Sequence, residues 1–401
     1  MSAAERRLLG LLAVHFVVYG VAVTLVGATI PEIIRSFGWS YLGAGAVMAA
    51  GSAGYLSGCF SGGVLVRRAG ARHMLLAGLA LEAGGLGFFG SDPGLVFNLG
   101  VLLLVGLGQG WIEVATNYCL VRLEKPGESR LMNLIHAGFT AGACLGPAAV
   151  GALLAGGAAW RLAYGGVALL LLGVGVVALR LPFPAAADEP AESSRAALGR
   201  LARDPVLLLL GAVIFLYVGA EHGLSSWIAE YYVETFALPT AAGAYMVSVL
   251  WLGLLVGRLA LSAGYRGRRQ ALLLVGLCAL AALPLPLALL SPSPWLAGAL
   301  FLLCGLGLSA VYPVVMALVG ECYAGEQSLA LGLVSGAGGV GALSFPFAMA
   351  AIAGRYGIAQ SFWFCAATAG AMTLAAGAVL VQRRGRGRPD QLLENSTSRS
   401  R

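Results

Sequence analysis

The feature that most constrains this chain is a series of long apolar runs, separated by short polar stretches. A helix that spans a bilayer needs about 20 consecutive, mostly apolar residues. Twelve runs of suitable length can be marked off along the sequence, over residues 9–31, 42–66, 73–91, 97–121, 131–155, 160–182, 206–232, 240–264, 270–291, 294–319, 327–353 and 359–382. We therefore expect an all-α membrane protein with 12 transmembrane helices.

The composition indicates that the solvent of this chain is lipid. Hydrophobic residues make up 59% of the 401 residues and charged residues only 11%, whereas soluble domains carry roughly 25% charged residues. The same figures exclude a disordered chain. The 7 cysteines form no CxxC pair, so we expect them to be small core residues rather than disulfides or metal ligands.

The net charge of +7 comes from short basic clusters between the apolar runs and does not indicate nucleic-acid binding. Lys and Arg gather in the cytoplasmic loops of membrane proteins. If the N-terminus is inside, only Arg35, Arg161 and Arg355 fall on the outer side. We therefore predict that both termini are cytoplasmic, in a multi-pass protein of the plasma membrane, with a bacterial inner membrane favoured.

The two halves of the chain repeat each other. FVVYG, which begins at Phe16, matches FLYVG near Phe215, the GLG at 106–108 matches that at 305–307, and Pro147 matches Pro346, always 199 residues apart. Parallel six-helix repeats occur in transporters whose site lies between the halves. The predicted organisation is two pseudo-symmetric six-helix bundles at 1–182 and 206–382, a cytoplasmic linker at 183–205 and a basic, disordered tail at 383–401.

Polar side chains in the first half form stripes inside the predicted spans. Gln109, Glu113 and Asn117 follow one another at i, i+4 and i+8, which places them on one helix face. Asn133 and His136, near the inner end of the fifth span, are candidates to line a cavity or to join helices by hydrogen bonds. Ionisable groups inside a bilayer are costly, and this makes them functional candidates.

Two further ionisable residues of the first half fit structural roles better. Glu82 in the third span has no polar stripe around it, so we expect it to be structural. His15 in the first span is an isolated histidine, and packing explains it at least as well as a functional role.

The second half carries its own polar set. Tyr217, Glu221 and Ser225 share one face of the seventh span. The other candidates adjoin this face or lie in the tenth span: His222, Trp227 and Tyr312. Trp227, near the outer end, fits an anchor at the membrane interface as well as a platform for stacking.

Two carboxylates in facing halves, Glu113 and Glu221, are what a proton-coupled carrier needs. Burial from water disfavours the charged form of a carboxyl, so such a group can bind and release a proton during a transport cycle. Amides donate to and accept from hydroxyl groups, and aromatic rings cover apolar C–H faces. The set of residues therefore favours a polyhydroxylated, sugar-like solute.

Motifs for other chemistry are missing from the sequence. It holds no Walker A loop, no HExxH and no GxSxG, and the GxGxxG match at 336–341 lies inside a predicted span. We expect no enzyme activity, no cofactor and no metal site. The expected partners are a small-molecule substrate, protons or Na⁺, and the lipid bilayer, and the expected state is a monomer.

The twelve spans, the repeat and the central linker resemble the major facilitator superfamily. Its loop signature after the second span, GxxxD-R/K-xGR-R/K, is matched here by Gly63, Arg68, Gly70 and Arg72, which the resemblance implies form a gating loop. Arg67 stands at the acidic position of that signature, and Ala71 replaces a basic residue.

Within that superfamily the chain most resembles the fucose permease-like sugar:proton symporters. The resemblance rests on the segments GLGQGWIEVATNYCLV, MNLIHAGFTAGACLGP, YVGAEHGLSSWIAEYY followed by GRLALSAGYR, and SAVYPVVMAL. The first contains the E-x-A-x-N motif as Glu113 and Asn117. The resemblance implies solute uptake by alternating access, with proton coupling through an acidic residue of span one, but Gly27 stands at that position when the chains are aligned on Pro31.

The departure at Gly27 leaves three forms of coupling open. Glu113, with Glu221, carries the proton, or the carrier uses Na⁺, or it is a uniporter. A rival hypothesis comes from Gly142, Gly146, Pro147 and Gly151, which resemble a GxxxGP motif of proton-driven drug exporters. Helix packing with a proline bend explains these residues too. A membrane sensor that moves no solute is the most distant alternative.

Overall fold

The structure is a computed structural model of the chain and describes residues 2–124, 130–184, 195–264 and 269–386. These residues form helices joined by short turns, with no strand among them. The predicted disordered tail beyond residue 386, the linker residues 185–194 and the loop that holds Arg266 and Arg268 lie outside the described residues.

The first half of the chain forms five helices, and a short helix follows in the linker. Their bounds are α1 (Ala3–Phe37), α2 (Tyr41–Phe88), α3 (Leu95–Leu123), α4 (Arg130–Ala155), α5 (Arg161–Ala178) and α6 (Arg195–Leu201). The second half continues with α7 (Pro205–Phe236), α8 (Thr240–Gly264), α9 (Gln270–Ala282), α10 (Pro284–Leu290), α11 (Pro294–Leu308), α12 (Val311–Cys322), the 3₁₀ turn η1 (Ala324–Glu326), α13 (Gln327–Tyr356) and α14 (Ile358–Arg386).

Ten segments of the described residues are helical, long and apolar enough to cross a membrane, with α9–α10 and α11–α12 each counting as one. The other two predicted spans, 42–66 and 73–91, are the two arms of α2. The arms meet at Gly70, whose φ of 80° and ψ of 154° lie outside the helical region. Gly54 on one arm and Gly78 on the other both pack against α3, so α2 is a hairpin. The prediction of an all-α, multi-span protein is confirmed.

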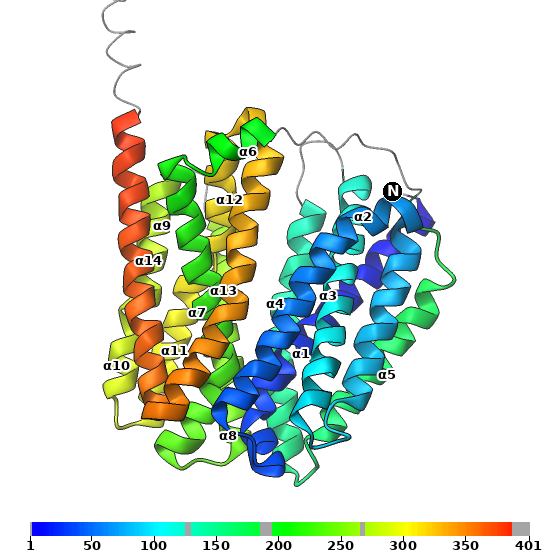
Figure 1. Cartoon of the computed structure of the whole chain (residues 1–401), viewed down its shortest axis with the longest axis vertical. Helices are drawn as coiled ribbons and strands as arrows, with labels where there is room; N and C mark the ends of the chain where they lie inside the picture. The colour runs from blue at the N-terminus through cyan, green and yellow to red at the C-terminus, as the bar shows by residue number, and fades with distance from the viewer. Residues whose placement is uncertain (1, 125–129, 185–194, 265–268, 387–401) are drawn as a thin grey trace, which may run out of the picture.

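The 199-residue repeat recurs in the packing of the helices. A Cβ on Gly54 would lie 2.0 Å from the Leu103 carbonyl oxygen, and a Cβ on Gly253 would lie 2.2 Å from that of Leu302. Each member of the second pair stands 199 residues after its counterpart in the first. Small residues let helix backbones approach closely in lipid. The two groups of helices in Figure 1 therefore share this backbone contact.

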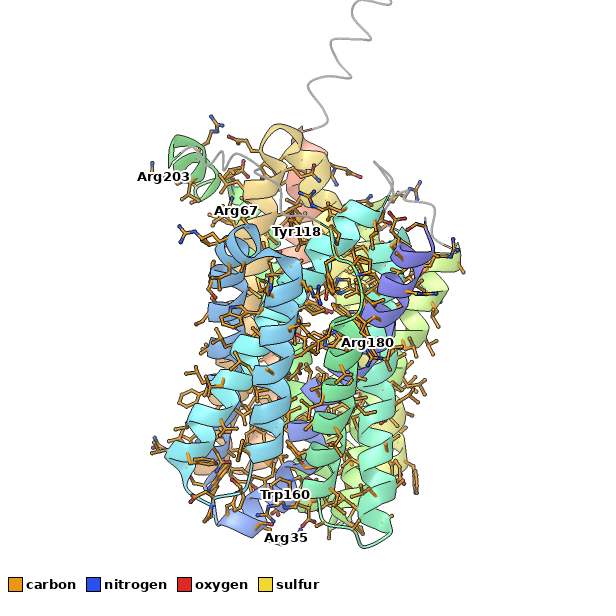
Figure 2. All side chains as sticks on the ribbon, turned by 90° about the vertical axis from the view of Figure 1, so that its right-hand side faces the viewer. Arg35, Arg67, Tyr118, Trp160, Arg180 and Arg203 are labelled. Atoms are coloured by element: carbon orange, nitrogen blue, oxygen red, sulfur yellow. The ribbon has the colours of Figure 1, made fainter. Side chains whose placement is uncertain are left out.

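The labelled residues in Figure 2 locate the two ends of the molecule. Arg67 and Arg203 lie toward the end that holds the N-terminus, here called the terminal end (Figures 1 and 2). Arg35 and Trp160 lie at the opposite end, here called the distal end. In Figure 1 the two groups of helices converge at the distal end, where α1, α2 and α8 come together. Across the halves α4 packs on α8, α2 on α13 and α1 on α7.

Candidate functional site

Glu113, half-buried on α3, gathers side chains from several helices around it. The Tyr19 hydroxyl on α1 donates to its Oε2 atom at 3.3 Å. Glu113 also interacts electrostatically with His136 on α4 and with Tyr312 on α12. Tyr312 belongs to the second half of the chain and stands 199 residues after Glu113. The site therefore lies between the halves and combines a carboxylate on one side with a phenol on the other.

Aromatic rings continue this surface across the interface. The Phe139 ring lies 5.2 Å from the Tyr19 ring and 5.9 Å from the ring of Trp251 on α8. The His136 ring meets Phe16 edge-on at 5.3 Å. Such rings offer apolar faces beside the polar groups at Glu113.

The polar stripe of the second half is largely satisfied within the protein. The Tyr217 hydroxyl donates to Glu221 one turn along α7, and both side chains are buried. Ser225 accepts from the indole N–H of Trp251 at 2.8 Å. Tyr312 and Ser335 share a hydrogen bond of 3.0 Å, and the rings of Tyr217 and Tyr312 lie 6.5 Å apart. Tyr217 therefore stands between Glu221 and Tyr312.

Several predicted site residues lie away from this group or have other partners. Gln109 donates to Oε1 of Glu82 at 2.9 Å rather than joining Glu113. Trp227 is fully buried and donates to the Pro346 carbonyl oxygen at 3.0 Å, so its indole is neither exposed to lipid nor part of the group around Glu113. Asn133 is exposed, and His222 is partly buried.

Asn117, one turn beyond Glu113 on α3, keeps an unused acceptor. Its Oδ1 atom is buried and has no hydrogen-bond partner among the described residues. Buried polar atoms are normally satisfied. A hydroxyl or amine of a bound solute is a suitable donor for this oxygen.

Arg258 is the residue of this region that the polar stripes missed. It lies within α8, and its Nη1 atom donates to Thr140 Oγ1 on α4 at 2.5 Å, across the two halves. Its Nε atom donates to the Ser309 carbonyl oxygen at 3.0 Å, and the guanidinium also interacts with Tyr217. The sequence signal for Arg258 is a lone arginine inside an apolar run. The sequence analysis counts it only among the basic residues of the inner side.

The predicted gating loop lies at the terminal end, where α2 turns at Gly70. Arg72 donates to the Leu179 carbonyl oxygen just after α5. Gly63 and Arg68 are exposed. Arg67, which replaces the expected acid, is exposed at the same end (Figure 2).

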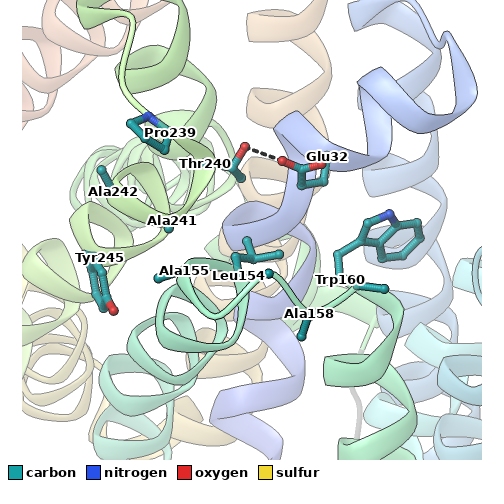
Figure 3. A pocket seen from close by; sticks show the side chains of 12 residues that line it. Glu32, Leu154, Ala155, Ala158, Trp160, Pro239, Thr240, Ala241, Ala242 and Tyr245 are labelled. Carbon is teal, nitrogen blue, oxygen red and sulfur yellow. Dashed lines mark hydrogen bonds between the residues drawn. The ribbon is translucent and has the colours of Figure 1, made fainter.

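Two polar contacts join the halves at the distal end. Thr240 donates to Glu32 at 2.7 Å (Figure 3), and Tyr41 donates to Glu230 at 3.0 Å. Beside the Thr240–Glu32 bond lies a pocket of about 670 Å³, which Trp160 also lines. This pocket is at the distal end, apart from the group around Glu113.

Helices that span a membrane in two repeated sets, with a polar group between them, define a multi-pass carrier of the solute-transporter class. The sequence profile of the Major Facilitator Superfamily matches residues 12–307 and 265–399, and the chain belongs to that family.

Relatives of known sequence are distant. Membrane protein MosC of Rhizobium meliloti is 24% identical over 393 residues, which cover 94% of this chain and 91% of MosC. Bypass of stop codon protein 6 of Saccharomyces cerevisiae is 27% identical over 278 residues, which cover 62% of this chain and 55% of the yeast protein. A TsgA homolog of Yersinia pestis is 24% identical over 57% of this chain and 54% of its own length. The chain thus spans about half the length of the latter two.

Solved structures of the same fold include transporters for different solutes. A mutant of the nucleoside transporter NupG superimposes with a TM-score of 0.76 at 14% identity, over 94% of this chain and 99% of that chain. The E. coli fucose:proton symporter FucP, in a mutant form, gives a TM-score of 0.65 at 18% identity, over 94% and 99%. These likenesses establish the fold and support the resemblance to the fucose permease-like proteins.

Proposed function

We propose that this protein is a secondary active transporter that moves a small neutral polar solute, with a sugar as the first candidate, by alternating access. Proton coupling through Glu113 is part of the proposal. The observation that carries it is the meeting of Glu113, Tyr19, His136 and Tyr312 between the halves. Hydroxyl-bearing solutes are the ligands that such acids, phenols and imidazoles recognise by hydrogen bonds.

In this proposal the terminal end faces the cytoplasm, because basic residues gather there. The distal end then faces outward, and the Thr240–Glu32 and Tyr41–Glu230 bonds form its closed gate. The conformation described here is thus one in which the solute site is shut off from the outside. Opening of that gate, with closure at the terminal end, would complete the transport cycle.

An acidic solute, such as a sugar acid, is the second candidate, and Arg258 supports it. No carboxylate forms an ion pair with Arg258 among the described residues, although this guanidinium lies between the halves. Guanidinium groups bind carboxylates with two parallel hydrogen bonds.

Export of amphiphilic compounds remains an alternative, with weaker support. The residues of the GxxxGP segment make close helix contacts: a Cβ on Gly142 would lie 1.9 Å from the Val17 carbonyl oxygen, and one on Gly151 would lie 2.9 Å from the Tyr245 ring. Packing accounts for these glycines whatever the solute.

Purified protein in proteoliposomes tests the proposal with four classes of solute. The panel consists of neutral sugars including fucose, the nucleoside uridine, the sugar acid glucuronate, and the hydrophobic cation tetraphenylphosphonium. We expect uptake of a neutral hydroxylated solute, increased by an inward proton gradient. Transport of glucuronate alone would favour the second candidate, and transport of the cation alone would overturn the proposal. A solute that binds to the protein but is not moved across the proteoliposome membrane would favour a membrane sensor.

A further inference from the structure

Glu82 is a carboxyl that the site around Glu113 does not use. It lies on the second arm of α2 with no exposed surface. Its Oε1 atom accepts a hydrogen bond of 2.9 Å from the Gln109 amide on α3. Its Oε2 atom is buried and has no hydrogen-bond partner among the described residues, and no basic side chain described here forms an ion pair with it.

This geometry fits a neutral carboxylic acid better than a carboxylate. An ionised carboxylate buried with one oxygen unpaired bears the full cost of lost hydration. A proton on Oε2 removes the charge and leaves Oε1 as the carbonyl oxygen. The Gln109 amide N–H can donate to that carbonyl oxygen.

The repeat shows that helix packing does not require an acid at this position. Residues 199 places after Glu82 and Gln109 are Ala281 and Leu308. A Cβ on Gly108 would lie 3.0 Å from the Glu82 backbone nitrogen, and a Cβ on Gly307 would lie 2.2 Å from that of Ala281. The same backbone contact is thus made in the second half with an apolar pair in place of the acid and amide.

The titratable groups on the helices near Glu82 come from α1, α3 and α5. From α1, Tyr19 interacts with it electrostatically, and Tyr19 also bonds Glu113. From α3, its direct partner Gln109 has no titratable group, and the carboxyl of Glu113 stands one turn beyond Gln109. The titratable side chains of α5, which also packs on α2, are engaged elsewhere: Arg161 donates to the Gly90 carbonyl oxygen and Tyr164 bonds Thr29. Tyr19 therefore stands between two carboxyls of the first half.

We propose that Glu82 is a second proton-binding site of this carrier, protonated on Oε2 in the conformation described here. It releases that proton to water, and becomes a carboxylate, in another conformation of the transport cycle, in which water reaches Glu82. The inference rests on the proposed function for its place in the transport cycle. Span one has Gly27 where the fucose permease-like proteins have an acidic residue. Glu82 would give the first half a second carboxyl beside Glu113.

Infrared difference spectroscopy of the purified protein at neutral pH tests the protonation directly, without any solute. The C=O stretch of a protonated carboxylic acid should be present in the wild type and absent in Glu82→Gln. Gln109→Leu should keep the band but shift it to higher frequency, because the carbonyl loses its donor. Glu113→Gln is the matched control and should leave the Glu82 band in place. A spectrum unchanged by Glu82→Gln in folded protein would overturn the proposal.

The double variant Glu82→Ala with Gln109→Leu guards against a folding defect, since it gives the first half the apolar pair of the second. Its spectrum should also lack the band.

A transport measurement then tests the role in coupling. For the panel solute that the wild type accumulates, Glu82→Gln should keep counterflow and lose at least half of the proton-driven accumulation. Wild-type accumulation in Glu82→Gln would show a structural proton and overturn the coupling role. If the wild type accumulates no panel solute, the proposed function fails, while the infrared result still decides whether Glu82 binds a proton.

Discussion

The guanidinium of Arg258 on α8 donates to the hydroxyl of Thr140 on α4 at 2.5 Å, so a charged residue of the second half is bonded to the first. The same guanidinium holds the Ser309 carbonyl oxygen within its own half. Because α4 and α8 belong to different halves, movement of one half against the other must stretch or break the bond to Thr140. Arg258 therefore reports on the relative position of the halves.

Replacement of Arg258 by Met should lower solute uptake at least about tenfold, equal to about 1.4 kcal/mol. Thr140→Val should cost less, because Arg258 keeps its bond to Ser309. Initial rates of uptake in proteoliposomes measure both. Arg180 is exposed, so Arg180→Met is the control for the loss of one positive charge. If Arg258→Met takes up solute at the wild-type rate, the guanidinium has no role in transport.

Gly45 tests the gate at the distal end. A Cβ at this position would lie 2.3 Å from the Ala350 Cβ across the halves, so Gly45→Leu should prevent closure of that end. A cysteine at position 240, in a background without the native cysteines, should then react faster with a membrane-impermeant thiol reagent, while uptake is lost. Gly84 has open space around it, so Gly84→Leu should change neither. An unaltered labelling rate in Gly45→Leu would contradict the proposed gate.

Gly70 tests the hairpin of α2. Its φ of 80° and ψ of 154° form a conformation that is essentially restricted to glycine, so Gly70→Ala should lower the free energy of unfolding by about 1 to 3 kcal/mol. The thermal unfolding midpoint of the purified protein measures this. Gly100 lies within α3 in open space, and Gly100→Ala should leave the midpoint unchanged or raise it. A loss of stability as large for Gly100→Ala would show that the backbone at Gly70 is not the cause.

Much of the fold follows from the sequence because lipid imposes a simple rule: a span must be apolar and helical. The rule finds the arms of α2 as two runs, and Gly70 explains how they join. The repeat is also readable, since glycines such as Gly54 and Gly253 are required where helix backbones touch. The break between α11 and α12 at Ser309 also has a sequence signal, because Pro313 cannot donate the i→i−4 hydrogen bond to the Ser309 carbonyl oxygen.

The site is less predictable, because helical periodicity gives the face of a residue but not its partner. Gln109 shares a face with Glu113, yet its amide reaches Glu82 on α2. Trp227 follows the stripe of α7 but is buried against α13, where it bonds Pro346. Arg258 has no polar neighbours in sequence, and only the packing of α8 against α4 brings it to Thr140.

The central claim is that Glu113 couples proton movement to solute movement, and Glu113→Gln tests it most directly. The glutamine keeps the size and an acceptor for Tyr19 but does not titrate. In proteoliposomes loaded with the panel solute that the wild type transports, this variant should retain solute counterflow and lose accumulation driven by a proton gradient. Full proton-driven accumulation in Glu113→Gln would contradict the account and transfer the coupling role to other carboxyls, with Glu221 as the next candidate.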